Sequence, residues 1–315
     1  MCHYTGAFAA GAAVTDLAPA AVAADTVDEA AAESLRTVLR TSLEIIAKAY
    51  EEYGPPSPPP HAHTDDCAAS SEVPGSACAA SAGLDNEADL ALSLSFNGGK
   101  DCTVLLALIG AVRWLAAAPR DRAGCEGEAG VGGMPSVTAI GEVNSWHSAQ
   151  ARHARWHAAY LKTRNPFPVV EQFIETAVVW SGIELEAVPM ASREEGGMKA
   201  TLERLLNGHH ALKAMFMGTR RGDPYSDHLE AFTATDDGWP ALMRVFPLLH
   251  WSYKHVWDFL RLFRVPYCEL YDDGYTSLGD VHNTLRNPHL LSDSDSEAYL
   301  PAYALTDDSQ ERSGR

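Results

Sequence analysis

The stretch LALSLSFNGGKDCTVLL, residues 90–106, decides the fold of this chain. Large apolar residues alternate with smaller ones over its first positions, which predicts a strand. After a turn with two glycines, apolar residues recur at helical spacing (Val104, Leu108 and Val112), which predicts a helix. A strand, a glycine turn and a helix in this order is the layout of a phosphate-binding site.

The turn carries donors suited to an anion. Gly98 and Gly99 have no Cβ, so the backbone can adopt positive φ and lie close to a bulky ligand. The first amides of the helix have no intrahelical partners, and Asn97 and Lys100 add an amide and an ammonium group. Asp101 would hold a divalent cation or cap the helix, and an ordinary capped turn is the alternative. The spacing differs from the G-x-x-x-x-G-K-[ST] P-loop of kinases and GTPases.

Composition narrows the class of protein. The 315 residues are 46% hydrophobic and 21% charged, which indicates a globular chain with a substantial core. The formal net charge of −18 argues against broad binding to nucleic acid or anionic membranes, which requires clustered Lys and Arg. No apolar run approaches the roughly 20 residues that span a bilayer. We expect no nucleic-acid partner and no membrane partner.

The cysteines and the N-terminus indicate a reducing compartment. The six cysteines form no CxxC pair, so neither a disulfide framework nor a zinc ribbon is expected. No Lys or Arg precedes Arg36, so the basic start of a signal peptide or of a mitochondrial transit sequence is missing. We expect a cytoplasmic protein.

Composition also divides the chain into segments. GPPSPPP, residues 54–60, ends an amphipathic helix because proline lacks the backbone donor that a helix needs. We expect a disordered N-terminus over residues 1–25, a helix over 26–53, a Pro/Ala/Ser-rich low-complexity linker over 54–86, and one main domain over 87–315 with insertions at 119–135 and 141–162.

Strand and helix patterns alternate along the main domain. Beyond the first unit we expect strands at 136–140, 184–189 and 214–218, and helices at 166–183, 198–206 and 251–263. This alternation predicts an α/β fold with a Rossmann-like parallel sheet and helices on both faces. Ligands of such sheets bind beyond the carboxyl ends of the strands, so we expect the site there.

Two histidine-containing segments are possible metal sites. His61, His63, Asp65, Asp66 and Cys67 lie in the linker, where a polar disordered tract is the favoured interpretation. In 144–162, interpreted as a helical insertion, His153 and His157 would share a helix face as metal ligands sometimes do. An exposed insertion without a metal is favoured.

A second candidate motif is GTRRGDPYS, residues 218–226, at the end of the strand expected at 214–218. Its two guanidinium groups could clamp phosphate oxygens, and Asp223 stands just before a proline. A surface loop with a charge pair is the alternative.

A third candidate is DDGWPALMRVFPLLH, residues 236–250. It combines Trp239, Met243 and Phe246 with Arg244, and an aromatic or thioether surface beside a guanidinium suits a flat heterocycle with a phosphate tail. On residue types alone, a loop that packs on the core is at least as good an interpretation. At the C-terminus, Arg312 and Arg315 of ERSGR have the composition of a frayed basic tail.

These segments, taken in order, resemble the eukaryotic FAD synthases. SFNGGKDC, residues 95–102, resembles their modified PP-loop, which belongs to the broader adenine nucleotide alpha-hydrolase-like group with the phosphoadenylylsulfate reductases. GTRRGDP resembles the G-[TI]-R-x-x-D-P segment, and TDDGWPALMR resembles the flavin motif T-D-x-x-W-P-x-F-M-R, with Leu242 in place of Phe. LYDDGYTSLG and ERSGR also follow the family pattern. The resemblance covers residues 89–315.

The resemblance implies an FMN adenylyltransferase, which joins ATP and FMN into FAD and pyrophosphate with Mg²⁺ bridging phosphates. It implies catalytic roles for Asn97, Asp101, Asp223 and Arg312, with Asp101 and Asp223 as the metal-binding pair. It implies ATP contacts from Leu94, Phe96, Asn97, Gly98, Gly99, Lys100, Thr219, Arg220 and Arg315. It implies flavin contacts from Asp236, Asp237, Gly238, Trp239, Met243 and Arg244.

Two other functions remain open at this stage. A phosphoadenylylsulfate reductase-type enzyme would share the fold, but it needs a nucleophilic cysteine near the C-terminus, and the last cysteine here, Cys268, is followed by Glu269 and has no Cys-Gly pair. A non-catalytic flavin- or nucleotide-binding module would bind FMN and ATP without releasing pyrophosphate.

Overall fold

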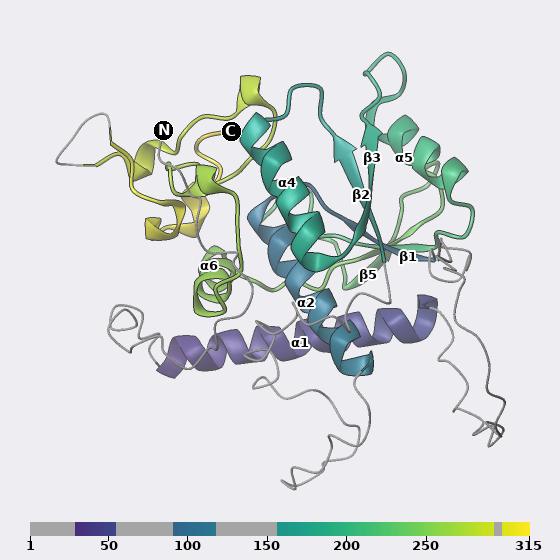
Figure 1. Cartoon of the computed structure of the whole chain (residues 1–315), viewed down its shortest axis with the longest axis horizontal. Coiled ribbons are helices and arrows are strands. Elements are labelled where there is room, and N and C mark those ends of the chain that lie inside the picture. The colour runs from purple at the N-terminus through teal and green to yellow at the C-terminus, as the bar shows by residue number, and fades with distance from the viewer. Residues whose placement is uncertain (1–28, 55–90, 118–155, 293–297) are drawn as a thin grey trace, which may run out of the picture.

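The computed structural model describes residues 29–54, 91–117, 156–292 and 298–315 (Figure 1). The predictions for the N-terminal 25 residues, the linker, the insertion at 119–135, the strand at 136–140 and the metal candidate at 61–67 lie outside these residues. The elements relevant to function are α1 Glu29–Tyr53, β1 Leu92–Ser95, α2 Lys100–Ala117, β2 His157–Lys162, α4 Pro168–Ser181, β3 Glu184–Pro189, α5 Gly197–Gly208, β4 Ala214–Phe216, β5 Phe232–Ala234, β6 Met243–Val245 and α6 Tyr253–Leu262.

A six-stranded sheet organises the chain in the order β3-β2-β1-β4-β6-β5. All neighbours are parallel except β5, which pairs antiparallel with β6 at the edge. The chain winds from β1 through β2 to β3 and then crosses to β4 on the other side of β1. The order therefore reverses between β1 and β4, where α/β sheets bind ligands at the carboxyl ends of the strands. The predicted α/β fold with a parallel sheet is confirmed.

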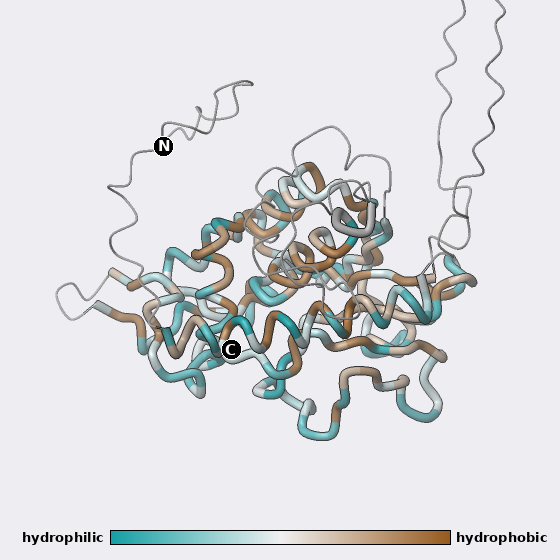
Figure 2. The backbone as a smooth tube through the Cα atoms, turned by 90° about the horizontal axis from the view of Figure 1, so that it is seen from below, coloured by the Kyte–Doolittle hydropathy of each residue, from teal (hydrophilic) through white to brown (hydrophobic). Residues whose placement is uncertain are grey.

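Helices cover both faces of the sheet. Ala158 and Tyr160 of β2 join a large core that includes residues of α1, α2, α4 and α6, whereas Ala159 joins a smaller core with Leu202 and Leu205 of α5. Figure 1 shows α2 and α4 side by side with α1 across the lower end of α2. Figure 2 shows hydrophobic residues in the interior of the fold, while many of the hydrophilic residues lie along its outer segments.

Helix α1 agrees with the helix expected over 26–53 for the residues that the structure describes, from Glu29 to Tyr53. It presents a buried stripe at helical spacing that packs on the sheet-covering helices (Leu35, Leu39, Leu43 and Ile46). The buried Ser42 hydroxyl donates to the carbonyl of Pro247 at 2.7 Å and accepts from the Trp251 indole at 2.8 Å. These bonds join α1 to the segment before α6. No helix in the described part of the chain is long and apolar enough to cross a membrane.

The prediction of a helix over 144–162 is wrong for residues 157–162. Residues 157–162 form β2, which pairs with β1 on one side and β3 on the other. The run HAAYLK is buried on both faces of a parallel sheet, so its pattern is almost continuously apolar and does not reveal a strand period. His157 therefore does not share a helix face with His153, which lies outside the described residues.

Candidate functional site

The glycine turns after β1 and β4 meet at the reversal point of the sheet. Gly98 has φ +73°, and a Cβ there would lie 2.9 Å from a side-chain carbon of Ile174 in α4. A Cβ on Gly218 would lie 3.1 Å from the backbone nitrogen of Cys102. Both turns therefore need glycine for close packing, and Gly98 also needs it for its backbone conformation.

The phosphate-loop donors already have protein partners. The Gly99 amide donates to Asn97 Oδ1 at 3.0 Å, and the Lys100 amide donates to the Tyr271 hydroxyl at 2.8 Å. The Asn97 side chain thus stabilises the turn through this hydrogen bond to the turn backbone. A phosphate that uses these two amides must take the place of the Asn97 and Tyr271 oxygens.

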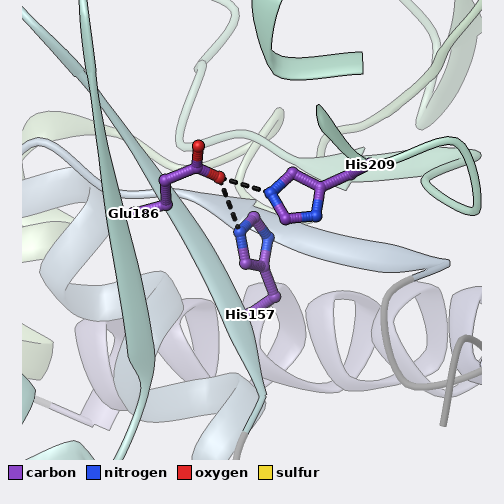
Figure 3. Close-up of side chains that lie close together, drawn as sticks. All are labelled: His157, Glu186 and His209. Atoms are coloured by element: carbon purple, nitrogen blue, oxygen red, sulfur yellow. Dashed lines mark hydrogen bonds and ion pairs between the residues drawn. The ribbon is translucent and has the colours of Figure 1, made fainter. Parts of the chain in front are cut away.

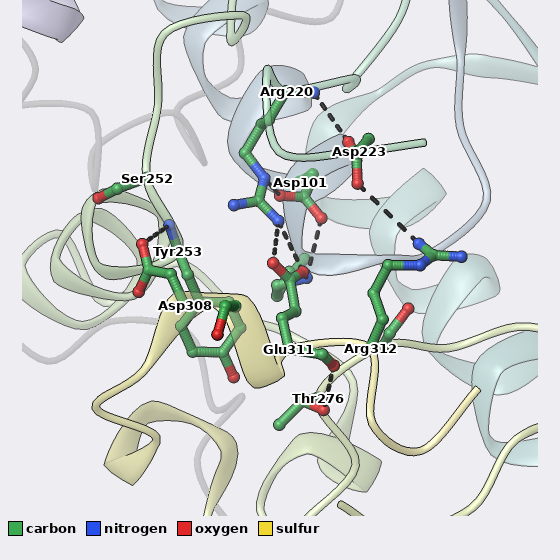
Figure 4. A network of polar contacts seen from close by, with 12 residues as sticks. Asp101, Arg220, Asp223, Ser252, Tyr253, Thr276, Asp308, Glu311 and Arg312 are labelled. Carbon is green, nitrogen blue, oxygen red and sulfur yellow. Dashed lines mark hydrogen bonds and ion pairs between the residues drawn. The ribbon is translucent and has the colours of Figure 1, made fainter. Parts of the chain in front are cut away.

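A compact charge cluster fills the space in front of the turn (Figure 4). Lys100 Nζ lies 3.0 Å from Asp101 Oδ2 and 2.6 Å from Glu311 Oε1. Arg220 Nε lies 2.6 Å from Asp101 Oδ1, and Arg220 Nη2 lies 2.6 and 2.5 Å from the two Glu311 oxygens. Only 3% of the Lys100 side chain and 5% of the Arg220 side chain are exposed. Two buried cations thus share two carboxylates.

Asp223 and Arg312 extend the cluster toward solvent. Asp223 Oδ2 accepts from the Arg220 backbone amide at 2.8 Å, and Asp223 Oδ1 lies 4.0 Å from Arg312 Nη1. The Arg312 side chain is 42% exposed and is therefore free to approach a ligand. The predicted catalytic residues Asp101, Asp223 and Arg312 come together here.

The surroundings shift the pKa values of the two aspartates in opposite directions. Burial opposes ionisation of Asp101, but the charges of Lys100 and Arg220 outweigh it and lower the Asp101 pKa. Burial raises the Asp223 pKa, and the Asp101 and Glu311 charges add to this effect. Burial also opposes the charge of Arg220, yet the Asp101 and Glu311 charges raise its pKa. The hydrogen bond from the Arg220 amide and the Arg220 charge oppose the rise of the Asp223 pKa without cancelling it, so Asp223 is a carboxylate whose negative charge a nearby cation would stabilise.

The C-terminal segment is anchored to the turn region that includes residues 274–279. Thr276 Oγ1 donates to the Glu311 carbonyl at 2.6 Å, and Asn287 Nδ2 donates to Thr276 Oγ1 at 2.9 Å. Arg315 Nη1 donates to the Leu278 carbonyl at 2.5 Å. Arg315, expected to contact ATP, therefore binds protein backbone in this structure, while Glu311 is held over the phosphate turn.

The remaining nucleotide candidates lie close to the cluster. Leu94 and Phe96, expected to contact ATP, are fully buried in the core, so neither residue presents an exposed atom to a nucleotide in this structure. Thr219 lies half-buried between Gly218 and Arg220.

The flavin-motif residues form a separate pocket of about 560 Å³. Its lining combines the turn between β5 and β6 with residues before β4 and the end of α1 (Tyr53, Leu212, Lys213, Ala234, Thr235, Asp236, Asp237, Gly238, Trp239, Ala241, Leu242 and Met243). Such a volume is in the range of about 300–1,000 Å³ typical of small-molecule sites. Arg244 does not line it. Its Nη2 donates to the Ala234 carbonyl at 2.7 Å and to Asp236 Oδ1 at 3.2 Å.

The pocket and the charge cluster lie toward opposite ends of β4. Met243, at the pocket, pairs with Ala214 at the start of β4, whereas Gly218, at the cluster, follows its end. At about 3.3 Å per residue, the four residues from Ala214 to Gly218 correspond to about 13 Å. The structure therefore brings Gly98 and Asp223 together but leaves Trp239 in a distinct pocket.

Two residues of the site were not predicted from the sequence. Glu311 belongs to the ERSGR motif, but nothing local marks a carboxylate as the partner of Lys100, 211 positions away. Tyr271 stands in the LYDDGYTSLG segment, yet only the fold reveals that its hydroxyl reaches the turn.

Comparisons with known proteins show which families this chain is similar to. The phosphoadenosine phosphosulfate reductase domain family matches residues 192–286. A probable FAD synthase of Schizosaccharomyces pombe is 34% identical over 224 residues, which are 71% of this chain and 71% of that protein. A probable FAD synthase of Caenorhabditis elegans is 35% identical over 227 residues, which are 71% of this chain but 36% of that protein.

A solved structure supports the fold. The crystal structure of Candida glabrata FMN adenylyltransferase superposes with a TM-score of 0.64, covers 93% of this chain and 90% of its own, and is 24% identical in sequence.

Proposed function

This chain belongs to the FAD synthase family, and we propose that it transfers the adenylyl group of ATP to the phosphate of FMN, giving FAD and pyrophosphate. The observation that carries the proposal is the cluster of Lys100, Asp101, Arg220, Asp223 and Arg312 at the reversal point of the sheet. It gathers residues of the SFNGGKDC, GTRRGDP and ERSGR segments into one place suited to polyphosphate.

The reaction needs positioning and charge neutralisation. An oxygen of the FMN phosphate forms a bond to the α-phosphorus of ATP, and the bond from that phosphorus to pyrophosphate breaks. Lys100, Arg220 and Arg312 would offset the negative charge of the attacking and departing phosphates. Burial raises the Cys102 pKa to about 12 and the Cys268 pKa to about 11, so neither thiol is a ready nucleophile. This argues against the reductase-type alternative.

ATP binding would require Glu311 to move. Lys100 and Arg220 can contact phosphate oxygens only if the Glu311 carboxylate leaves them, because these cations are almost fully covered. A phosphate group offers the same paired oxygens and more negative charge. While ATP is not bound, the Glu311 carboxylate would thus pair with Lys100 and Arg220 in the place that a phosphate group would take.

Mg²⁺ would enter beside Asp223. Burial and the neighbouring Asp101 and Glu311 charges raise the pKa of this carboxylate, and among the described residues its Oδ1 has Arg312, 4.0 Å away, as its charged partner, so a divalent cation would stabilise its ionised form. Asp101 is paired with both buried cations, so it would join the metal site only after these cations turn to phosphate. Bound Mg²⁺ would supply charge neutralisation between the phosphates.

The flavin ring would occupy the pocket of Asp236, Asp237, Gly238, Trp239 and Met243. FMN is elongated, with its ring and its phosphate at opposite ends of a ribityl chain. The pocket would hold the ring while the phosphate points along β4 to the charge cluster. The pair of Arg244 and Asp236 would hold the pocket turn in shape.

The organisation and location of the protein are part of the same proposal. We assign residues 87–315 to the catalytic domain and 1–86 to its N-terminal helix and flanking segments, because the motifs that resemble FAD synthases all lie after residue 87. We place the reaction in the cytosol, because the cysteine pattern suits a reducing compartment.

The test is formation of FAD. Purified full-length protein is incubated with FMN, ATP and Mg²⁺, and FAD and pyrophosphate are measured by chromatography and a coupled assay. We expect both products in equal amounts. Binding of FMN and ATP without pyrophosphate would make the protein a non-catalytic module, and release of sulfite from phosphoadenylylsulfate would make it a reductase.

Variants then test the assigned residues. Asn97→Ala and Asp223→Ala should each lower turnover by about a hundredfold or more, because a preorganised group is worth about 3–4 kcal/mol in the transition state. Asp227→Ala removes an exposed carboxylate four positions from Asp223 and should leave turnover unchanged. Near-normal turnover of either site variant would contradict the assignment.

A further inference from the structure

Three metal-ligating side chains converge away from the charge cluster (Figure 3). They are His157 of β2, Glu186 of β3 and His209, which follows α5. His209 Nε2 lies 2.5 Å from Glu186 Oε2, and His157 Nε2 lies 3.4 Å from the same oxygen. One ligand atom from each residue lies within 4.8 Å of the other two.

The fold places these side chains on the α5 face of the sheet. Glu186 pairs with Ala159, and His157 is two positions before Ala159, so all three strand positions point to one face. Ala159 packs in the core with α5, so this face is the one that α5 covers. His209 is the C-cap residue of α5, where its backbone N–H donates to the carbonyls of Leu205 and Leu206, and its imidazole centroid lies 4.6 Å from that of His157.

A hydroxyl group orients the buried histidine. His157 is 4% exposed, and its Nδ1 lies 2.8 Å from Ser93 Oγ. Metal binding through Nε2 requires the tautomer in which Nδ1–H donates to Ser93 Oγ, and the Ser93 hydroxyl can then donate its proton to the His157 carbonyl at 3.3 Å. This tautomer leaves the lone pair of Nε2 directed at Glu186. Such a second hydrogen bond is the usual support of a metal-ligating histidine.

The other groups of the cluster suit a cation as well. The side chains of Glu186 and His209 are 42% and 21% exposed, so an ion can enter from solvent. Lone pairs of two imidazoles and a carboxylate that face one point repel one another unless a proton or a metal ion lies between them.

We propose that His157, Glu186 and His209 bind a transition-metal ion of the zinc class. Two imidazole nitrogens and one carboxylate oxygen form a ligand set that zinc takes with three protein ligands and one open position. Ligand atoms about 3.3 Å apart correspond to a tetrahedral ion with bonds of about 2.0–2.1 Å, and the 3.4 Å between His157 and Glu186 matches this. His209 would move slightly outward from Glu186.

This site is distinct from the Mg²⁺ site of the proposed reaction. Mg²⁺ prefers oxygen ligands in octahedral geometry, whereas two histidines favour zinc and its neighbours in the transition series. Ser93, beside the histidine site, lies near the start of β1, whereas the charge cluster lies beyond its end. Bound metal would join β2, β3 and the end of α5. The turn after His209 leads to Leu212 and Lys213, which line the flavin-motif pocket.

The test uses the full-length protein without an affinity tag, freed of metal with a chelator and titrated with Co²⁺. Cobalt replaces zinc and gives visible absorption bands whose intensity reports four-coordinate geometry. We expect intense bands that saturate at one equivalent and disappear when Zn²⁺ is added. The variant Glu186→Gln/His209→Ala should lose these bands, because only the buried His157 remains.

The control variant is His210→Ala, which removes an exposed histidine next to the site. It should bind Co²⁺ as the wild-type protein does, which separates this site from the other histidines of the chain. The secondary structure of each variant is checked by circular dichroism. Equal Co²⁺ spectra for wild type and the double variant would overturn the proposal, as would bands of octahedral cobalt only.

Discussion

Neutralising Glu311 tests whether this carboxylate holds the place of the ATP phosphates. In Glu311→Gln, the buried Lys100 and Arg220 lose one of the two carboxylates that pair with them. Breaking a buried ion pair on one side costs about 3–5 kcal/mol. The Gln oxygen still accepts one hydrogen bond and Asp101 still pairs with both cations, so we expect about 3 kcal/mol.

The first measurement is thermal unfolding without nucleotide. A domain of this size shifts its Tm by about 2–4 °C per kcal/mol, so a loss of about 3 kcal/mol corresponds to about 6–12 °C. Glu203→Gln on the exposed surface of α5 is the matched control and should leave the Tm within about 2 °C, because surface substitutions change stability by about 0.5 kcal/mol or less.

The second measurement is ATP affinity by calorimetry, in the presence of Mg²⁺. If ATP displaces Glu311, the variant lacks a contact that the wild-type protein must break, and a lost contact of about 3 kcal/mol appears as ATP binding up to about a hundredfold tighter. ATP should therefore raise the Tm of the variant more than that of the wild-type protein. Equal or weaker ATP binding by Glu311→Gln would show that Glu311 stays with the cations when ATP binds.

Three further changes probe other parts of the site. Gly98→Ala combines left-handed backbone strain with a Cβ 2.9 Å from Ile174 and should lower the free energy of unfolding by about 2–4 kcal/mol. The control Gly182→Ala, with φ +70° and nothing within 4 Å of the new Cβ, should lower it only by the strain of about 1–2 kcal/mol. Equal losses of stability in urea unfolding would contradict this. The folded-state pKa of Asp223 is raised, so its ionised form costs stability above that pKa. Asp223→Asn should therefore be more stable than the wild-type protein at pH 7, although it is inactive. This difference in stability should disappear as the pH falls below about 4, where the carboxyl group is protonated in the unfolded chain as well. A lower Tm of the variant at pH 7 would refute the predicted direction. Trp239→Ala should weaken FMN binding about tenfold or more, since stacking on an aromatic ring is worth about 1–3 kcal/mol, while ATP affinity stays the same. FMN binding is measured by the quenching of flavin fluorescence. Unchanged quenching would show that the flavin ring does not bind in this pocket.

Local patterns predicted much of the architecture correctly. The alternation before Phe96, the glycine turn and the apolar spacing after it specify β1, the turn and α2, because each depends on residues within a few positions. The same is true of α1, whose buried stripe repeats at helical spacing, and of β3 at 184–189. The ordered motifs also carried the family assignment, since their residue types are tied to the chemistry of the loops.

Other features depended on long-range contacts. β2 was missed because a strand buried on both faces has no polar side to reveal its period, and only its pairing with β1 and β3 defines it. The hairpin of β5 and β6 consists of strands of three residues, too short for a pattern. The separation of the Trp239 pocket from the charge cluster follows from the direction of β6, which no local sequence encodes.

The sequence by itself determined the helices and strands with a clear local period, such as α1, β1, α2 and β3, and the chemical groups that the phosphate turn carries. Only the tertiary structure decided which distant groups meet them. Glu311 lies against Lys100, Tyr271 reaches the Lys100 amide, and His157 meets Glu186 and His209, each through pairing of strands or closure of long loops. Helix and strand periods act over a few residues, whereas charge and hydrogen-bond partners are set by packing across the whole sheet.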